Sequence, residues 1–233
     1  MRIVLIHGAA TDSRVWASTA VVLRESAEVL CPDRPQSGDL DTEIAFLAPL
    51  CAGMFVIGVS GGATLGLELA ARGVDIAGAL LHEPAAGSLA PGLLDHVAEG
   101  LASGGVAGFG AALYGPAWQP SCTTVRRETV EREFAMFGAF EPAPLGDVAE
   151  RVVLTVGERS PLARHRAVLA LAECLHTGRR VLPGVGHAAH LEGGFANPAV
   201  IPTGWVAALT HGNHEAGDAS ARTDGGQGRH ARP

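Results

Sequence analysis

Short apolar runs alternate with segments of helical character along most of the chain. The runs are RIVLI (2–6), EVLC (28–31), MFVIG (54–58), IAGALL (76–81), RVVLTV (151–156) and RRVLP (179–183). Each has the character of a strand that is apolar on both faces, which is typical of parallel sheets. The helical segments between them are 13–26, 40–51, 62–72 and 161–174. The alternation predicts an α/β fold with a mostly parallel sheet flanked by helices.

One long interval interrupts this order. Residues 84–147 contain no clear strand but many Gly, Ala, Leu and aromatic residues. Because that is too long for a loop in a compact domain, we expect an inserted helical cap over the strand ends. The core would then consist of residues 1–83 and 148–210. Residues 211–233 have almost no large apolar side chain, so we expect a disordered tail there.

Composition excludes several classes of function. The chain has 233 residues, 47% of them hydrophobic, which is enough for one full core. A net charge of −7 without a basic run argues against nucleic-acid or anionic-membrane partners. All 17 cationic residues are arginine, which excludes a lysine Schiff base. No apolar run reaches the length of a membrane span.

The cysteines and the N-terminal residues indicate a cytoplasmic protein. Cys31, Cys51, Cys122 and Cys174 are widely spaced, with no Cys-x-x-Cys pair, so we expect reduced thiols. The segment MRIVLIHG enters a strand-like run directly, without the features of a secretory signal. No metal or organic cofactor is implied. The oligomeric state is left open.

The segment FVIGVSGGATLG (55–66) carries one serine between glycines, where a predicted strand meets a predicted helix. Gly58-Val59-Ser60-Gly61-Gly62 fits the pattern Gly-x-Ser-x-Gly, in which the serine occupies a sharp turn and its neighbours must be small. The helix that follows directs its dipole and free N–H groups at this turn. The alternative is a glycine-rich turn with an incidental N-cap serine. The context favours a nucleophile at Ser60.

A serine nucleophile needs a base and an oxyanion hole. His187 follows a late predicted strand and a Gly-rich turn in LPGVGHAAHLE, and it is the leading base, with His190 as the alternative. The His-Gly-Ala turn after the first run can present the N–H of Ala9 towards that of Gly61, and these two groups would form the oxyanion hole. His7 would then hydrogen-bond the loop.

The motifs HGAATDSRVW, PDRPQSG, GVSGGA, LLHEP, VGERSP and PGVGHAAHLE follow one another in the order seen in a known superfamily. Residues 2 to about 209 resemble a compact, capped member of the α/β-hydrolase superfamily. Within the superfamily, the chain is similar to the esterase-like and hydroxynitrile-lyase-like branch. The resemblance implies that Ser60 is the nucleophile and His187 the base, with Ala9 and Gly61 as the oxyanion hole.

The third member of the triad departs from the family pattern. The family's acid usually follows the next-to-last strand as Gly-x-x-Asp, but VGERSP places Ser160 there, and serine cannot supply the charge. Glu83 follows the strand after the nucleophile strand, where some family branches place a glutamate, and it is the preferred acid. Glu158 and Asp147 remain alternatives, as does an incomplete triad.

The sequence predicts a serine hydrolase that cleaves an ester, thioester or lactone of a small, apolar or acyl-containing molecule. His190 and the cap aromatics Trp118 and Tyr114 are the candidate substrate-binding residues. Two alternatives stay open. The same site could serve an acyltransferase, cyclase or lyase, or the chain could be a non-catalytic, ligand-binding homologue.

Overall fold

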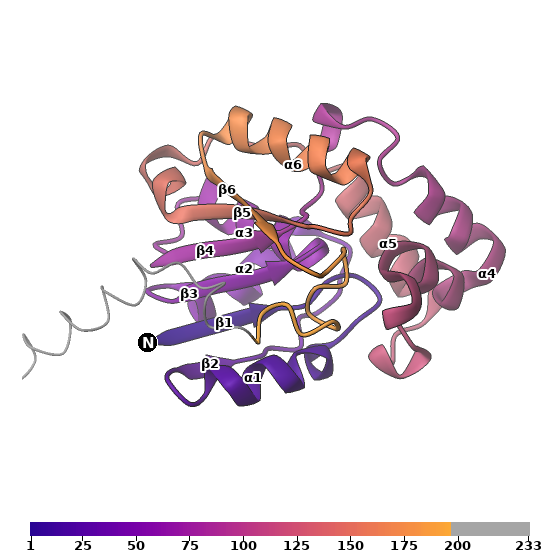
Figure 1. The fold of residues 1–233 in the computed structure, drawn as a ribbon, viewed down its shortest axis with the longest axis horizontal. Coiled ribbons are helices and arrows are strands. Elements are labelled where there is room, and N and C mark those ends of the chain that lie inside the picture. The colour runs from indigo at the N-terminus through magenta and orange to yellow at the C-terminus, as the bar shows by residue number, and fades with distance from the viewer. Residues whose placement is uncertain (197–233) are drawn as a thin grey trace, which may run out of the picture. The chain divides into compact units, whose positions relative to one another are not determined.

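The structure, a computed structural model, describes residues 1–196 and contains one six-stranded sheet (Figure 1). The strands are β1 (Arg2–Ile6), β2 (Glu28–Leu30), β3 (Phe55–Val59), β4 (Gly78–His82), β5 (Val152–Gly157) and β6 (Gly178–Leu182). Their order is β2-β1-β3-β4-β5-β6, and every neighbouring pair is parallel. The predicted parallel α/β sheet is therefore confirmed. The predicted tail and the end of the predicted core, residues 197–210, lie outside the described residues.

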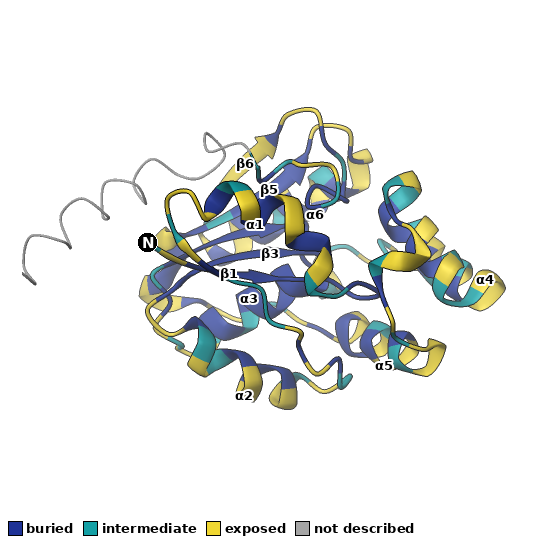
Figure 2. Ribbon diagram, turned by 90° about the horizontal axis from the view of Figure 1, so that it is seen from below, coloured by how far each residue is buried: buried dark blue, intermediate teal, exposed yellow. Residues whose placement is uncertain are grey.

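Helices cover both faces of the sheet. Helices α1 (Ala17–Leu23) and α6 (Leu162–Leu175) lie on one face, and α2 (Leu40–Cys51) and α3 (Gly61–Ala71) lie on the other (Figure 2). The predicted helix 13–26 differs slightly, because it begins as the 3-10 turn Ser13–Trp16. All residues of β3 and β4 are buried, which accounts for their apolar character on both faces.

The interval 84–147 contains helices and no strand. Its main elements are α4 (Asp95–Tyr114) and α5 (Arg127–Gly138), which lie beyond the carboxyl ends of the strands (Figure 1). The 3-10 helices Gly115–Ala117 and Pro120–Cys122 lie between them, Gly87–Leu89 precedes α4, and Gly146–Arg151 follows α5. Helix α4 is broken at Gly105, whose φ of 57° and ψ of −141° fall outside the helical region. Packed aromatic rings, such as Phe109 edge-on to Phe134 at 5.7 Å, join α4 to α5.

Two expectations from composition can be compared with the described part of the chain. All four cysteines are free. No helix among residues 1–196 combines the length and the apolar character that crossing a bilayer requires.

Candidate active site

Ser60 lies in a strained turn between β3 and α3. Its φ is 55° and its ψ is −121°, a backbone conformation that residues other than glycine rarely adopt. A Cβ atom on Gly58 would lie 2.5 Å from the carbonyl oxygen of Gly62, and a Cβ atom on Gly62 would collide with the carbonyl of Ile6. The turn therefore requires glycine on both sides of the serine.

Two backbone N–H groups, those of Ala9 and Gly61, lie close to Ser60 at the same cavity. Gly61 is the first residue of α3, so its N–H has no acceptor within the helix. A Cβ atom built on Gly61 would lie 3.3 Å from the nitrogen of Ala9, which shows how closely the two residues approach. Neither N–H donates a hydrogen bond to any residue in the described range. Both remain available to an oxygen bound at this point.

The orientation of the Ala9 N–H follows from contacts on the other side of its peptide group. The carbonyl of Gly8 accepts hydrogen bonds from Arg34 Nη2 at 3.0 Å and from Thr11 Oγ1 at 2.9 Å. In a trans peptide the N–H points opposite to the carbonyl. His7 Nδ1 also lies 3.0 Å from the Gly8 oxygen, as expected for a residue that supports the loop. These contacts turn the N–H of Ala9 away from Arg34.

His187 and Glu83 are in direct contact. Nδ1 of His187 lies 2.8 Å from Oε2 of Glu83, and both residues are buried. Because the carboxylate accepts a hydrogen bond, the imidazole proton belongs on Nδ1. Nε2 of His187 is buried and has no hydrogen-bond partner within residues 1–196. That nitrogen retains a lone pair able to accept a proton.

The carboxylate of Glu83 is held at its other oxygen by β5 and the loop after it. Oε1 accepts hydrogen bonds from the hydroxyl of Ser160 at 2.5 Å and from the N–H of Gly157 at 2.9 Å. The residue at the family's usual acid position therefore donates to the carboxylate that contacts His187. Glu83 itself has a φ of 47°, so two neighbouring strands each end in a strained residue.

The two other candidate carboxylates lie on the surface. Glu158 is exposed and accepts a hydrogen bond from the N–H of Gly184 at 2.7 Å. Asp147 is exposed near the start of a 3-10 helix. Within the described residues, Glu83 is the carboxylate in contact with His187.

The surrounding charges set the protonation states of this pair. Burial lowers the pKa of His187 to about 4, with the cation of Arg164 acting in the same direction and Glu83 opposing both. Burial acts to raise the pKa of Glu83, but the hydrogen bond from His187 and the nearby His82 and Arg164 hold it well below its usual range. At neutral pH the pair is therefore a carboxylate beside a neutral imidazole.

His82 supports the loop that carries His187. It is fully buried, with Nδ1 3.0 Å from the hydroxyl of Thr155 and Nε2 3.1 Å from the carbonyl of Gly186. These contacts are those of a structural residue.

The three candidate substrate-binding residues occupy different places. Tyr114 donates its hydroxyl hydrogen bond to the carbonyl of Ala9 at 2.9 Å, and its ring lies 5.4 Å from that of His187. Trp118 donates from Nε1 to the carbonyl of Ala10 at 2.9 Å. The cap therefore contacts the loop that carries the Ala9 N–H through both aromatic residues.

His190 lies deeper than the sequence suggested. It is fully buried, with its ring 5.4 Å from Trp16 and 5.5 Å from Tyr114. It lies in a series of turns after β6. Neither His190 nor Trp118 lines the cavities described next, whereas Tyr114 lines the larger one.

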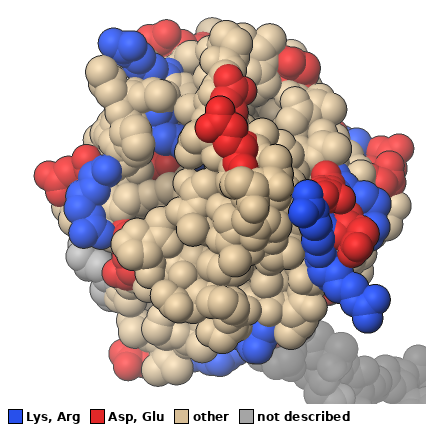
Figure 3. All heavy atoms as spheres, turned by 90° about the vertical axis from the view of Figure 1, so that its right-hand side faces the viewer, with Lys and Arg blue, Asp and Glu red and all other residues tan. Residues whose placement is uncertain are grey.

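Two cavities lie next to Ser60 and His187. A small one of about 30 Å³ contacts Ser60, Gly61 and Glu83. Its apolar wall comes from the cap: Leu94, Val97, Phe109, Leu113, Phe134 and Phe137. A groove of about 970 Å³ runs between α4 and the start of α6 and reaches His187. Among residues 1–196, Leu113 and Arg164 are the two that line both spaces. On the cap side of the molecule, Figure 3 shows a broad area without charged side chains, with acidic and basic side chains around it.

Sequence reasoning missed two contributors to this site. Ser160 was counted as a missing acid, and its hydrogen bond to Glu83 was not foreseen. Arg164 was not singled out, because an arginine in the first turn of a helix is ordinarily exposed. Nothing in the local sequence marks it as buried. Residues 1–196 contain no cluster of side chains able to hold a metal ion.

The order of these residues and the parallel sheet match a known family. Residues 3–200 match the sequence profile described as the alpha/beta hydrolase family. The chain belongs to that family. The resemblance noted in the sequence motifs is therefore confirmed. No curated protein matches the chain significantly.

Solved structures share this α/β-hydrolase fold at low sequence identity. BpoC from Mycobacterium tuberculosis H37Rv is 16% identical, with a TM-score of 0.66 over 90% of this chain and 92% of its own. A thermophilic esterase from Thermogutta terrifontis is 17% identical, with a TM-score of 0.62 over 92% and 90%. Naproxen esterase from Bacillus subtilis is 15% identical, with a TM-score of 0.56 over 89% and 83%. At these identities the similarity concerns the fold.

Proposed function

We propose that this member of the alpha/beta hydrolase family is a serine hydrolase that cleaves a carboxylic ester, thioester or lactone of a small molecule. The observation that carries the proposal is the 2.8 Å contact between His187 Nδ1 and Glu83. It leaves Nε2 free at the edge of the sheet where Ser60 occupies a strained turn. A nucleophile, a base and an orienting carboxylate at one edge of the sheet are what acyl transfer requires.

In the acylation step, Oγ of Ser60 attacks the substrate carbonyl and its proton passes to Nε2 of His187. The negative charge that develops on the carbonyl oxygen is stabilised by the N–H groups of Ala9 and Gly61. Collapse of the tetrahedral intermediate breaks the bond to the leaving oxygen or sulfur. The leaving group takes the proton from His187, and the acyl group stays on Ser60.

Deacylation repeats these events with water as the nucleophile. His187 accepts a proton from the water as its oxygen attacks the acyl carbonyl, and the same two N–H groups stabilise the second oxyanion. The bond to Ser60 then breaks, and His187 returns the proton to its hydroxyl. The products are a carboxylic acid and the alcohol or thiol released earlier.

Glu83 acts through His187 in this scheme. An ionised carboxylate keeps the imidazole proton on Nδ1 and stabilises the imidazolium that forms at each step. The hydrogen bonds from Ser160 and Gly157 keep the carboxylate in place. The low pKa of Glu83, for which its contact with His187 is the main cause, keeps it charged at neutral pH.

Two of the three structural neighbours described above support ester chemistry. Both are esterases. At 15% and 17% identity they support the reaction class, and substrate choice depends on the side chains of this cap.

An active-site-directed fluorophosphonate tests the nucleophile. We expect intact-mass analysis to show one adduct on the wild type and on Ser26→Ala, a variant of an exposed serine far from the turn. Ser60→Ala should show none and should lose hydrolysis of simple acetate esters. Equal labelling of Ser60→Ala, or no labelling of the folded wild type, would overturn the proposal.

A further inference from the structure

Arg164 is a buried cation with few hydrogen-bond or charge partners. It is 5% exposed and lies in the first turn of α6. Its nearest carboxylate is Glu83, with 3.8 Å between Nε and Oε2, which is too far for a hydrogen bond. Its guanidinium donates no hydrogen bond to any residue in the described range. A buried guanidinium has five N–H donors to satisfy, so this arrangement is costly.

Glu83 is not a dedicated partner for Arg164. Both of its oxygens are already engaged at hydrogen-bond distance by His187, Ser160 and Gly157. Burial lowers the pKa of Arg164, and the charge of Glu83 offsets only part of that effect. The guanidinium therefore has spare hydrogen-bonding capacity next to the candidate active site.

Arg164 lies where its free N–H donors can reach a bound molecule. Together with Leu113 it lines both the cavity beside Ser60 and the groove that reaches His187. A molecule that occupies both spaces would therefore contact these two side chains. A charged group on such a molecule would meet the guanidinium before its acyl carbon reached the serine.

The groove around Arg164 is more positive than the chain as a whole. Its lining includes Arg159 and Arg166 besides Arg164, and Glu192 is the one carboxylate that the described residues contribute to it. Glu192 is paired with Arg159 at 2.9 Å. The whole chain, by contrast, has a net charge of −7. The groove therefore favours an anion on an otherwise acidic protein.

We propose that Arg164 binds an oxyanionic substituent, a carboxylate or a phosphate, on the substrate that Ser60 attacks. This inference rests on the proposed function and narrows its substrate class to esters that carry an anionic group. The planar guanidinium matches either oxyanion with two parallel hydrogen bonds. The guanidinium lines both cavities, so an anion bound there can reach it directly.

Three acetate esters of one phenol scaffold test the proposal. The esters are 4-acetoxybenzoate, its neutral counterpart 4-acetoxybenzamide, and 4-acetoxyphenyl phosphate. Each kcat/KM is divided by the rate of alkaline hydrolysis of the same ester, so that leaving-group reactivity cancels. For the wild type we expect at least one anionic ester to exceed the amide by about tenfold or more, as hydrogen bonds between charged groups allow. The better of the two anions identifies carboxylate or phosphate as the natural group.

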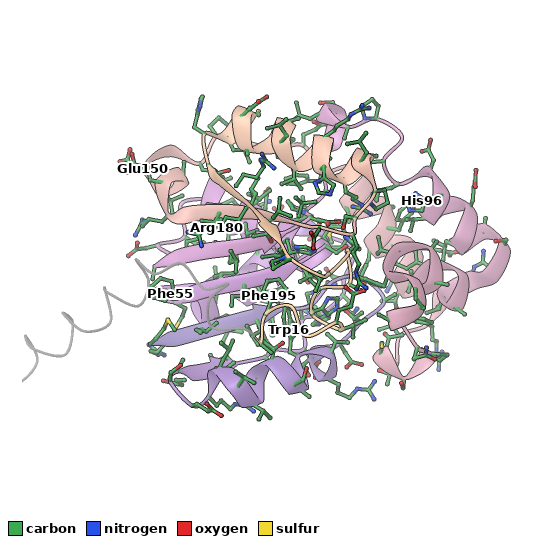
Figure 4. The ribbon with its side chains drawn as sticks, in the orientation of Figure 1. Trp16, Phe55, His96, Glu150, Arg180 and Phe195 are labelled. Carbon is green, nitrogen blue, oxygen red and sulfur yellow. The ribbon has the colours of Figure 1, made fainter. Side chains whose placement is uncertain are left out.

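The variants separate direct contact from net charge. Arg164→Gln should reduce the ratio of the corrected kcat/KM for the anionic ester to that for the amide-bearing ester to near one. Arg164→Lys should keep part of this anion preference. Arg180→Gln removes an equal charge from exposed β6, away from the His96 side of the groove (Figure 4), and should keep the full ratio. A wild type without anion preference, or an Arg164→Gln variant with the full ratio, would overturn the inference while leaving a Ser60-dependent hydrolase intact.

Failure of the proposed function would give a different pattern. In that case none of the three esters would show Ser60-dependent hydrolysis. Calorimetric titration then tests the anion site independently of hydrolysis, by comparing the binding of 4-hydroxybenzoate, 4-hydroxyphenyl phosphate and 4-hydroxybenzamide. Anion-selective binding that Arg164→Gln abolishes and Arg180→Gln retains would support an anion site. Absence of anion-selective binding would overturn it.

Discussion

Two buried arginines lie on opposite sides of Ser60, and their surroundings differ. The guanidinium of Arg34 is fully engaged, whereas that of Arg164 meets one carboxylate at 3.8 Å. The partners of Arg34 are two backbone carbonyls and two carboxylates: His7, Gly8, Glu43 and Glu133. Burial acts to lower the pKa of both, but for Arg34 the carboxylates outweigh it and raise the pKa, while for Arg164 the lowering prevails.

The difference shows how a buried charge can be assigned a role. Arg34 connects three parts of the fold, because Glu133 comes from cap helix α5, Glu43 from α2 and the carbonyls from the loop after β1. A cation whose donors are all satisfied by the protein has little left to offer a ligand. Arg164 has donors to spare and lies between two cavities. We therefore assign Arg34 to structure and Arg164 to recognition.

The largest contrast should appear in folding stability. Arg34→Met removes the cation beside two buried carboxylates, Glu43 and Glu133, and one donor from each of two carbonyls. We expect it to lower the free energy of unfolding by about 3–5 kcal/mol. Urea denaturation followed by circular dichroism measures this. A loss below about 1 kcal/mol would contradict the structural role of Arg34.

The matched substitution at the other arginine should cost far less. Arg164→Met removes a desolvated cation, and Glu83 keeps its three other hydrogen-bond partners. We expect the free energy of unfolding to stay within about 1 kcal/mol of the wild type, or to increase. The same urea titration checks both variants. Equal losses at the two positions would remove the distinction between them.

A smaller effect should appear in the pH dependence of catalysis. Because burial lowers the pKa of His187 to about 4, kcat/KM for the neutral amide ester should fall only as the pH approaches that value. The charge of Arg164 also lowers this pKa. Arg164→Gln should therefore raise the pKa and move the acid limb to higher pH, by up to roughly one unit.

The control for this shift is Arg180→Gln, which removes a distant positive charge. It should leave the acid limb of the pH profile of kcat/KM at the wild-type position. An acid limb that moves to lower pH in Arg164→Gln, or moves equally in both variants, would show that Arg164 does not act on His187.

The sequence predicted the sheet well because local signals determine it. The run 2–6 coincides with β1, and 54–58 differs from β3 by one residue. Buried parallel strands are recognisable from their continuous apolar character alone. The turn at Ser60 was recognisable for a similar reason, since crowding by neighbouring backbone demands glycines at fixed offsets.

The remaining features of the site depend on contacts between distant residues. Glu133 reaches Arg34 across 99 positions, and Ser160 reaches Glu83 across 77. Neither spacing leaves a periodic or compositional signal. Tyr114 and Trp118 are aromatic residues of the cap, but only their place in the fold shows that they donate to the Ala9 and Ala10 carbonyls. Sequence patterns could nominate these residues but not assign their partners.

The most direct test of the account is the kcat of Glu83→Gln beside Glu158→Gln, because Glu83 connects the base, Ser160 and Arg164. Glutamine keeps the shape of the side chain and removes the charge that holds the imidazole tautomer. We expect Glu83→Gln to lower kcat by about 10⁴-fold, as loss of a triad carboxylate does elsewhere, with the Ser60 adduct forming correspondingly slowly. Glu158→Gln should remain near the wild type. A Glu83→Gln variant with near wild-type kcat, or a collapse of activity in Glu158→Gln, would contradict the account.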